Sequence, residues 1–183
     1  MKSLLDYINE MAVDPIADNI RKDLKAKGIK VPGQVNVRTR RGGLSNAYDI
    51  IIKDLKVDAD ELRKIVKKYE DIDYDERTGE ILSGGNTYIH IQYDDTAERD
   101  EQRRLQKTVE QLVDQAMMDK GREVKLKNGY TFGVYTDTKD FDADKIKKGY
   151  AEPYKHLFFV RKNGKDVTRD FGAMWWLLVK AGY

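Results

Sequence analysis

The residues with the clearest chemistry are three arginines that stand before a pair of glycines, in the segment Arg38-Thr39-Arg40-Arg41-Gly42-Gly43. In an extended chain Arg38 and Arg40 point to the same side, and Arg41 lies at the turn. Guanidinium groups bind phosphate oxygens in pairs, and glycine lets a backbone come close to a phosphate. The segment therefore predicts contact with a nucleic-acid backbone. The alternative is a solvated strand edge whose cations oppose edge-to-edge association.

Two further groups of residues could complete such a surface. Lys22 and Lys25 lie on the outer side of the helix expected before the arginines. Tyr88, His90 and Gln92 alternate along an expected strand, where aromatic rings can stack on splayed bases unless another element covers that side. The residues predicted to bind nucleic acid or a partner are Arg38, Arg40, Arg41, Lys22, Lys25 and Tyr88.

Charge is strongly segregated along the chain, although 34 basic residues nearly balance 32 acidic ones. Residues 20–41 hold eight basic residues and one acid, whereas residues 70–80 hold six acids and one arginine. The overall balance excludes a global acidic mimic of DNA and a uniformly basic packaging protein. The acidic run could attract a divalent cation, imitate a row of phosphates for a basic partner, or pair with the chain's own basic stretch.

Catalysis finds little support in the sequence. Without cysteine there is no disulfide, no thiolate metal site and no cysteine nucleophile. The two histidines and three serines stand in no nucleophile elbow, and no glycine-rich loop matches a phosphate-binding fingerprint. Glu123-Val124-Lys125 has the local look of half a metal-dependent nuclease site, but no acidic partner is evident upstream. We therefore expect no enzyme activity, no cofactor and no metal, and keep a metal-dependent nuclease as a further alternative.

Hydrophobic periodicity predicts the elements that must hold these residues. Asp14-Pro15 begins a helix that ends at Gly28, and two strands follow, over 34–40 and 48–53. Asp58 begins another helix. After it we expect an acidic strand over 71–76, a short strand at 81–82 and a regular strand over 87–93. The first half of the chain is thus expected to have the order α-β-β-α-β-β.

The second half is expected to begin with a long helix. Asp95-Thr96-Ala97-Glu98 has the form of a capping box, and Gly121 marks the end of that helix. Two hairpins follow, around Asn128-Gly129 and Asn163-Gly164. Asp170 begins a final helix, in which residues 174–179 are apolar almost all round. That segment predicts core burial, with a surface for a partner or a second copy as the alternative.

These elements predict an α+β fold of two small packed lobes. We expect an N-terminal helix or leader over 1–13, a first α+β lobe over 14–95 and a second lobe over 96–183. The second lobe is the long helix followed by β-hairpins and a C-terminal helix. No apolar segment reaches the roughly 18 to 20 residues that cross a bilayer, and polar residues interrupt the N-terminus. We therefore expect neither a membrane segment nor a secretory signal.

The order of elements over residues 14–95 resembles a known family. The resemblance rests on the helix 16–26, the strand Val35-Asn36-Val37-Arg38-Thr39-Arg40, the turn Gly42-Gly43-Leu44-Ser45-Asn46, the strand ending at Lys53-Asp54 and the helix ending at Tyr69-Glu70. This pattern is similar to one of the large polyvalent protein-associated domains of phages and conjugative elements. Ile52-Lys53-Asp54 stands where that family has Trp-Asp-Gly. The resemblance implies a mobile-element protein in a bacterial cell, often beside counter-defence modules, and implies no particular activity.

The first ten residues carry a second resemblance. Lys2, Tyr7 and Ile8-Asn9-Glu10 look like the leader of internal head proteins of tailed phages, in which a prohead protease cuts after such a glutamate. This resemblance implies packaging into the virion and loss of residues 1–10. An ordinary packed helix is the alternative.

Together these observations predict a phage or mobile-element accessory protein that acts sterically, as counter-defence and host-takeover proteins do. Its expected partner is nucleic acid or a host protein that processes nucleic acid, and its expected location is the bacterial cytoplasm. The alternative is a virion protein, either packaged cargo or a head or tail component, with other virion proteins as partners. The sequence does not fix the oligomeric state.

Overall fold

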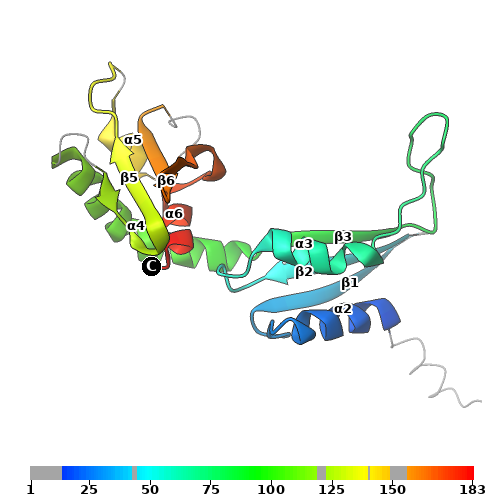
Figure 1. Cartoon of the computed structure of the whole chain (residues 1–183). Coiled ribbons are helices and arrows are strands. Elements are labelled where there is room, and N and C mark those ends of the chain that lie inside the picture. Colours follow the sequence, from blue (N-terminus) through cyan, green and yellow to red (C-terminus); the bar gives the residue numbers. More distant parts are fainter. Residues whose placement is uncertain (1–13, 43–44, 119–122, 140, 149–155) are drawn as a thin grey trace, which may run out of the picture. The chain divides into compact units, whose positions relative to one another are not determined.

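The computed structural model describes residues 14–42, 45–118, 123–139, 141–148 and 156–183 (Figure 1). The chain divides into two compact units, Met1–Ala97 and Glu98–Tyr183. Both units contain helices and a β-sheet, which confirms the predicted α+β class. The expected N-terminal helix or leader over 1–13 lies outside the described residues.

The described residues of unit 1 form a three-stranded sheet with two α-helices packed on it. Its elements are α2 (Pro15–Ala26), β1 (Val35–Gly42), β2 (Ser45–Ile52), α3 (Ala59–Val66), the 3-10 helix η1 (Lys67–Tyr69) and β3 (Thr87–Tyr93). The strand order is β1-β2-β3. β1 and β2 are antiparallel neighbours, while β2 and β3 run parallel and are joined by the crossover through α3 (Figure 1).

The predicted starts and ends of the unit 1 helices are confirmed. The Asp14 carboxylate accepts the amide of Ala17 at 3.1 Å, Pro15 is the first helical residue, and Gly28 has a φ of +82° just beyond α2. Asp58 caps α3 by accepting the amides of Asp60 and Glu61. These local signals explain why helices begin here and not a few residues away.

Both helices of unit 1 cover the same face of its sheet. Alternate strand residues on that face are buried together with residues of α2 and α3, and they are Val35, Val37, Tyr48, Ile50, Ile52 and Ile89. Asp14 fastens the start of α2 to this layer, because its carboxylate also accepts the hydroxyls of Thr39 and Tyr48, each at 3.0 Å. The opposite face of the sheet therefore carries the intervening residues, among them Arg38 and Arg40.

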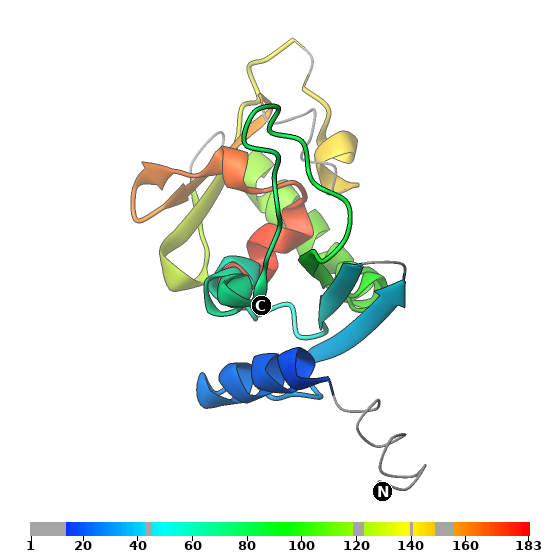
Figure 2. The ribbon, with the colours of Figure 1, turned by 90° about the vertical axis from the view of Figure 1, so that its right-hand side faces the viewer.

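The expected acidic strand over 71–76 and the short strand at 81–82 are wrong. Residues 70–86, called the acidic arm below, contain only two isolated bridges, between Asp71 and Thr87 and between Tyr74 and Ile81. Ile72 and Tyr74 alternate with the acids, but Tyr74 is 54% exposed, so burial of one side does not favour a longer ladder here. In Figures 1 and 2 the arm is a long loop that extends from the start of β3. The order of unit 1 is therefore α-β-β-α-β.

Unit 2 holds a four-stranded antiparallel sheet of order β4-β5-β6-β7. Helix α4 (Asp95–Met118) precedes it and crosses the division between the units. The other elements are β4 (Val124–Lys125), η2 (Lys127–Gly129), β5 (Tyr130–Val134), α5 (Ala143–Lys147), β6 (Phe158–Lys162), β7 (Lys165–Asp166), η3 (Thr168–Asp170) and α6 (Met174–Ala181). Both predicted hairpins are present, and Asn128, Gly129, Asn163 and Gly164 all have the positive φ that such turns need.

Two predicted helix starts in this part of the chain are displaced. Asp94, not Asp95, caps α4, because its carboxylate accepts the amides of Thr96 at 3.1 Å and Ala97 at 3.0 Å. Asp170 lies in η3, and α6 begins four residues later, after Ala173. The apolar segment of α6 is buried as predicted, with Met174, Trp175, Leu177, Leu178 and Val179 all in the core. No helix in the described ranges combines the length and the apolar character that a membrane span requires.

Candidate nucleic-acid interface

The face of the unit 1 sheet that α2 and α3 do not cover, called the open face below, carries several of the residues predicted from the sequence to bind a ligand. The register places Arg38 opposite Asp49 and Asp49 beside His90. One step along, Arg40 lies opposite Ala47, and Ala47 lies beside Tyr88. Two arginines of β1 and two rings of β3 thus share one surface. The open face consists of Asn36, Arg38, Arg40, Ala47, Asp49, Ile51, Tyr88, His90 and Gln92.

The two arginines of the open face differ in their partners. Arg40 donates from Nη2 to Oδ1 of Asp49 at 2.8 Å, yet 62% of its side chain remains exposed. Arg38 is exposed, and no described residue forms an ion pair with it. A surface pair like that of Arg40 contributes about 1 kcal/mol or less, so a phosphate can replace Asp49 as its partner. Both guanidinium groups are therefore accessible to an anion.

The rings of Tyr88 and His90 lie nearly parallel to each other on the same face as the arginines. Their ring centroids lie 6.3 Å apart with planes only 16° from parallel. The Tyr88 hydroxyl accepts a hydrogen bond from Nδ2 of Asn86 at 3.2 Å, and Asn86 is 2% exposed. The buried amide thus fixes the orientation of the tyrosine. A ring held in this way offers a stacking surface with little loss of side-chain freedom on binding.

The structure does not bring every predicted residue to this face. Lys22 and Lys25 are exposed on α2, but α2 packs on the opposite face of the sheet through Ala17, Ile20 and Leu24. The two lysines therefore do not extend the surface of Arg38 and Arg40. Arg41 lies in β1 opposite Asn46, and its side chain falls outside the described part of the structure.

The covering layer of unit 1 has an ionic cluster of its own. Oδ2 of Asp23 accepts the Tyr69 hydroxyl at 2.6 Å and pairs with Nζ of Lys68 at 2.6 Å. Lys68 and Tyr69 hold the pKa of Asp23 below its usual value, and Asp23 raises the pKa of Lys68. This cluster joins α2 to η1, and it pairs Lys68 with the single acid of the basic stretch 20–41. The alternative in which the acidic run pairs with that stretch is not seen, because no ion pair among the described residues joins residues 71–76 to residues 20–41.

The described residues show no arrangement around Glu123 and Lys125 that would support the nuclease alternative. Glu123 and Lys125 lie on either side of buried Val124, and the Glu123 carboxylate forms an ion pair with Arg161 of β6. Within the described ranges, no group of three or more histidine, aspartate or glutamate side chains could hold a metal ion. The Glu123 carboxylate is thus engaged in an ion pair with a side chain of β6.

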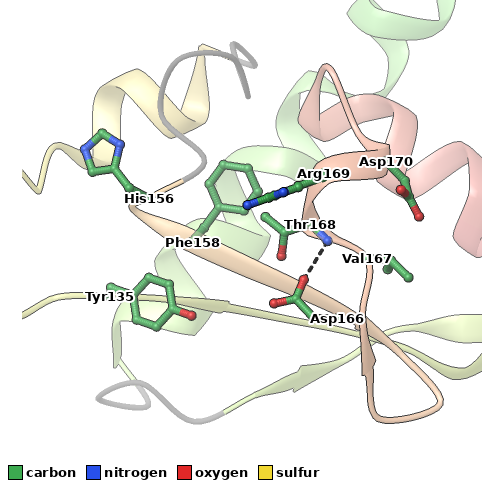
Figure 3. A pocket seen from close by; sticks show the side chains of 8 residues that line it. All are labelled: Tyr135, His156, Phe158, Asp166, Val167, Thr168, Arg169 and Asp170. Atoms are coloured by element: carbon green, nitrogen blue, oxygen red, sulfur yellow. Dashed lines mark hydrogen bonds between the residues drawn. The ribbon is translucent and has the colours of Figure 1, made fainter.

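Unit 2 contains a hollow of about 660 Å³ that no sequence pattern predicted. Tyr135 and His156 lie on one side of it, and the segment Asp166–Asp170 lies on the other (Figure 3). Asp166 accepts the amide of Thr168 at 2.8 Å, and this contact holds the pKa of Asp166 below its usual value. The carboxylate therefore stabilises the turn into η3. These residues come from separate elements, so only the Asp-x-Thr turn pattern could have pointed to part of the hollow.

The chain matches no family model, no curated protein and no solved structure.

Proposed function

We propose that this protein binds single-stranded nucleic acid on the open face of unit 1. The observation that carries the proposal is the combination of an exposed guanidinium that forms no ion pair with a described residue (Arg38) with the parallel rings of Tyr88 and His90 on the open face. Arginine binds the phosphates, and the rings stack on unpaired bases. A duplex keeps its bases stacked inside, so it offers nothing to the rings.

Asp49 sets the strength of this binding. It lies directly opposite Arg38 in the register and pairs with Arg40, so the described part of the face carries two guanidinium groups and one carboxylate. Phosphate binding then depends on few cations and weakens as salt rises. Such a face supports moderate, reversible binding better than permanent packaging.

The cellular setting is part of the same proposal. The resemblance of residues 14–95 supports an accessory protein of a phage or conjugative element in the bacterial cytoplasm, where an occupied strand is sterically blocked from host enzymes. The virion alternative rests on residues 1–10, which lie outside the described residues. Mass spectrometry of purified particles tests that alternative, since a packaged protein would be abundant there and would begin at Met11.

The decisive experiment measures binding of a labelled single-stranded oligonucleotide by fluorescence anisotropy over a range of salt concentrations. The double variant Arg38→Glu/Arg40→Glu should lose at least about tenfold in affinity and reduce the salt slope by about two. Tyr88→Ala should weaken binding without changing the salt slope, because it removes stacking and not charge.

The matched control is Lys22→Glu/Lys25→Glu, which changes the net charge equally on the other side of unit 1. Its loss should be about threefold or less, since exposed charges more than about a Debye length away are screened. Equal losses in both double variants would show that only total charge matters. Full binding by Arg38→Glu/Arg40→Glu would remove the open face as the site.

A further inference from the structure

The acidic arm exposes large apolar side chains in a place where polar ones would be expected. Tyr74, Ile81 and Leu82 are 54%, 52% and 47% exposed. Among the described residues of unit 1, they are the only large hydrophobic side chains that are exposed to this extent. Tyr74 and Ile81 are directly bridged across the arm, so their side chains lie on the same side of it. A cluster of this kind on a polar surface is typical of a protein-binding site.

The two limbs of the arm are joined by hydrogen bonds. The amide of Leu82 donates to the carbonyl of Asp73 at 2.9 Å, and the amide of Asp75 donates to the carbonyl of Glu80 at 2.8 Å. At the base, Asn86 accepts the amide of Asp73 at 2.8 Å and donates to the carbonyl of Leu82 at 2.7 Å. The apolar side chains are thus presented on a formed scaffold, which lowers the entropy cost of binding.

The charge around the apolar side chains selects the partner. Residues 70–80 contain six acids and Arg77. Asp75 is used within the arm, where the amides of Thr78 and Arg77 hold its pKa below the usual value. The remaining arm carboxylates that are exposed and form no ion pair with any described residue are Asp71, Asp73, Glu76 and Glu80. They would repel nucleic acid and anionic lipid and attract a cationic surface.

We infer that the acidic arm docks onto a protein partner with a basic surface that contains an apolar pocket, which receives Tyr74 and Ile81. Apolar contact supplies the affinity, while the surrounding carboxylates select the partner and speed its approach. The arm binds through residues that the open face does not contain. The inference therefore holds whether or not the open face binds nucleic acid, and the two are tested by different variants.

The test uses the full chain and three synthetic peptides of equal length: an amphipathic peptide of lysine and leucine, a peptide of lysine and serine with the same charge, and an amphipathic peptide of glutamate and leucine. Isothermal titration calorimetry should detect binding of the lysine–leucine peptide, at least about tenfold weaker binding of the lysine–serine peptide, and none of the glutamate–leucine peptide. Amide shifts in an NMR titration should fall within residues 70–86.

The variant Tyr74→Ser/Ile81→Ser should lose at least about tenfold in affinity for the lysine–leucine peptide. Because both side chains are exposed, its thermal unfolding should match that of the parent. Met118→Ser/Tyr135→Ser is the matched control, since it removes exposed apolar side chains from unit 2, and it should bind as the parent does. The inference is overturned if no peptide binds, if the lysine–serine peptide binds equally well, or if the arm variant keeps its affinity.

Discussion

The two sheets of this molecule use their faces differently. In unit 1 the inner face of the sheet is buried and the outer face holds exposed arginines, so buried and exposed residues alternate along β1. In unit 2 the central strands are buried on both sides, as Phe132, Gly133 and Val134 of β5 and Phe158, Phe159 and Val160 of β6 show. Sheets covered on both sides contribute stability, whereas a half-covered sheet keeps a surface for binding.

Gly133 shows how closely the second sheet is packed. A Cβ atom at this position would overlap the ring of Phe159, so only glycine leaves room for that ring to lie across β5. No comparable constraint acts on the open face of unit 1, where Arg38, His90 and Gln92 are exposed. Truncation of a side chain to alanine should therefore lower the free energy of unfolding much more in the unit 2 sheet than on the open face.

The largest expected effect is a loss of stability from a substitution in the buried sheet of unit 2. Phe158 is 1% exposed and packs against Phe132 at a ring-centroid distance of 5.9 Å. Phe158→Ala should lower the free energy of unfolding by about 3–5 kcal/mol, because it leaves a cavity among rings. His90→Ala on the open face should change it by no more than about 0.5 kcal/mol. Urea unfolding of both variants measures the difference, and similar losses would show that the open face is also a structural surface.

A smaller effect sharpens the role of the open face. Asp49→Asn removes the one carboxylate that pairs with Arg40. Affinity for single-stranded nucleic acid should rise by about threefold to tenfold, and the salt slope should increase by up to about one, because Arg40 becomes free for phosphate. Anisotropy titrations measure both quantities. Unchanged or weaker binding would mean that the Asp49–Arg40 pair does not compete with the ligand.

The smallest effect concerns the covered side of the first sheet. Since Lys68 and Tyr69 lower the pKa of folded Asp23, the ionised carboxylate favours the folded state. That contribution is fully present above the ordinary pKa of 3.8 and is lost as the pH falls through the lowered value. Asp23→Asn should therefore lower the Tm slightly at neutral pH, and the difference should close in acid. Thermal melts of both proteins across this pH range would contradict the assignment if the difference persisted at the acid end.

Features set by neighbouring residues could be predicted from the sequence. Asp14, Asp58 and the two Asn-Gly turns act within a few residues, so their pattern is sufficient. Period-two alternation also placed Arg38 and Arg40 on one face. The cap of α4 was displaced by one residue because Asp94 and Asp95 both suit that position, and only the folded geometry distinguishes them.

Features set by strand register and layer order could not be predicted from the sequence. The pairing of Arg40 with Asp49 needs the register of β1 on β2, and the separation of Lys22 from the open face needs the side on which α2 packs. Alternation over residues 71–76 predicts a strand, but alternation alone does not show whether one side of the segment will be buried. The unit 2 hollow joins residues from three parts of the chain, which no local pattern connects.

The Asn86 side chain connects the acidic arm of unit 1 to its open face. One carboxamide bonds to both limbs of the acidic arm and also to the hydroxyl of Tyr88 on the other surface. A displacement of the arm at its root can therefore reach the Tyr88 ring through the Asn86 side chain, in addition to the two backbone hydrogen bonds that join Asp71 to Thr87 of β3. Asn86 is therefore the side chain through which binding at the acidic arm and binding at the Tyr88 ring would be coupled.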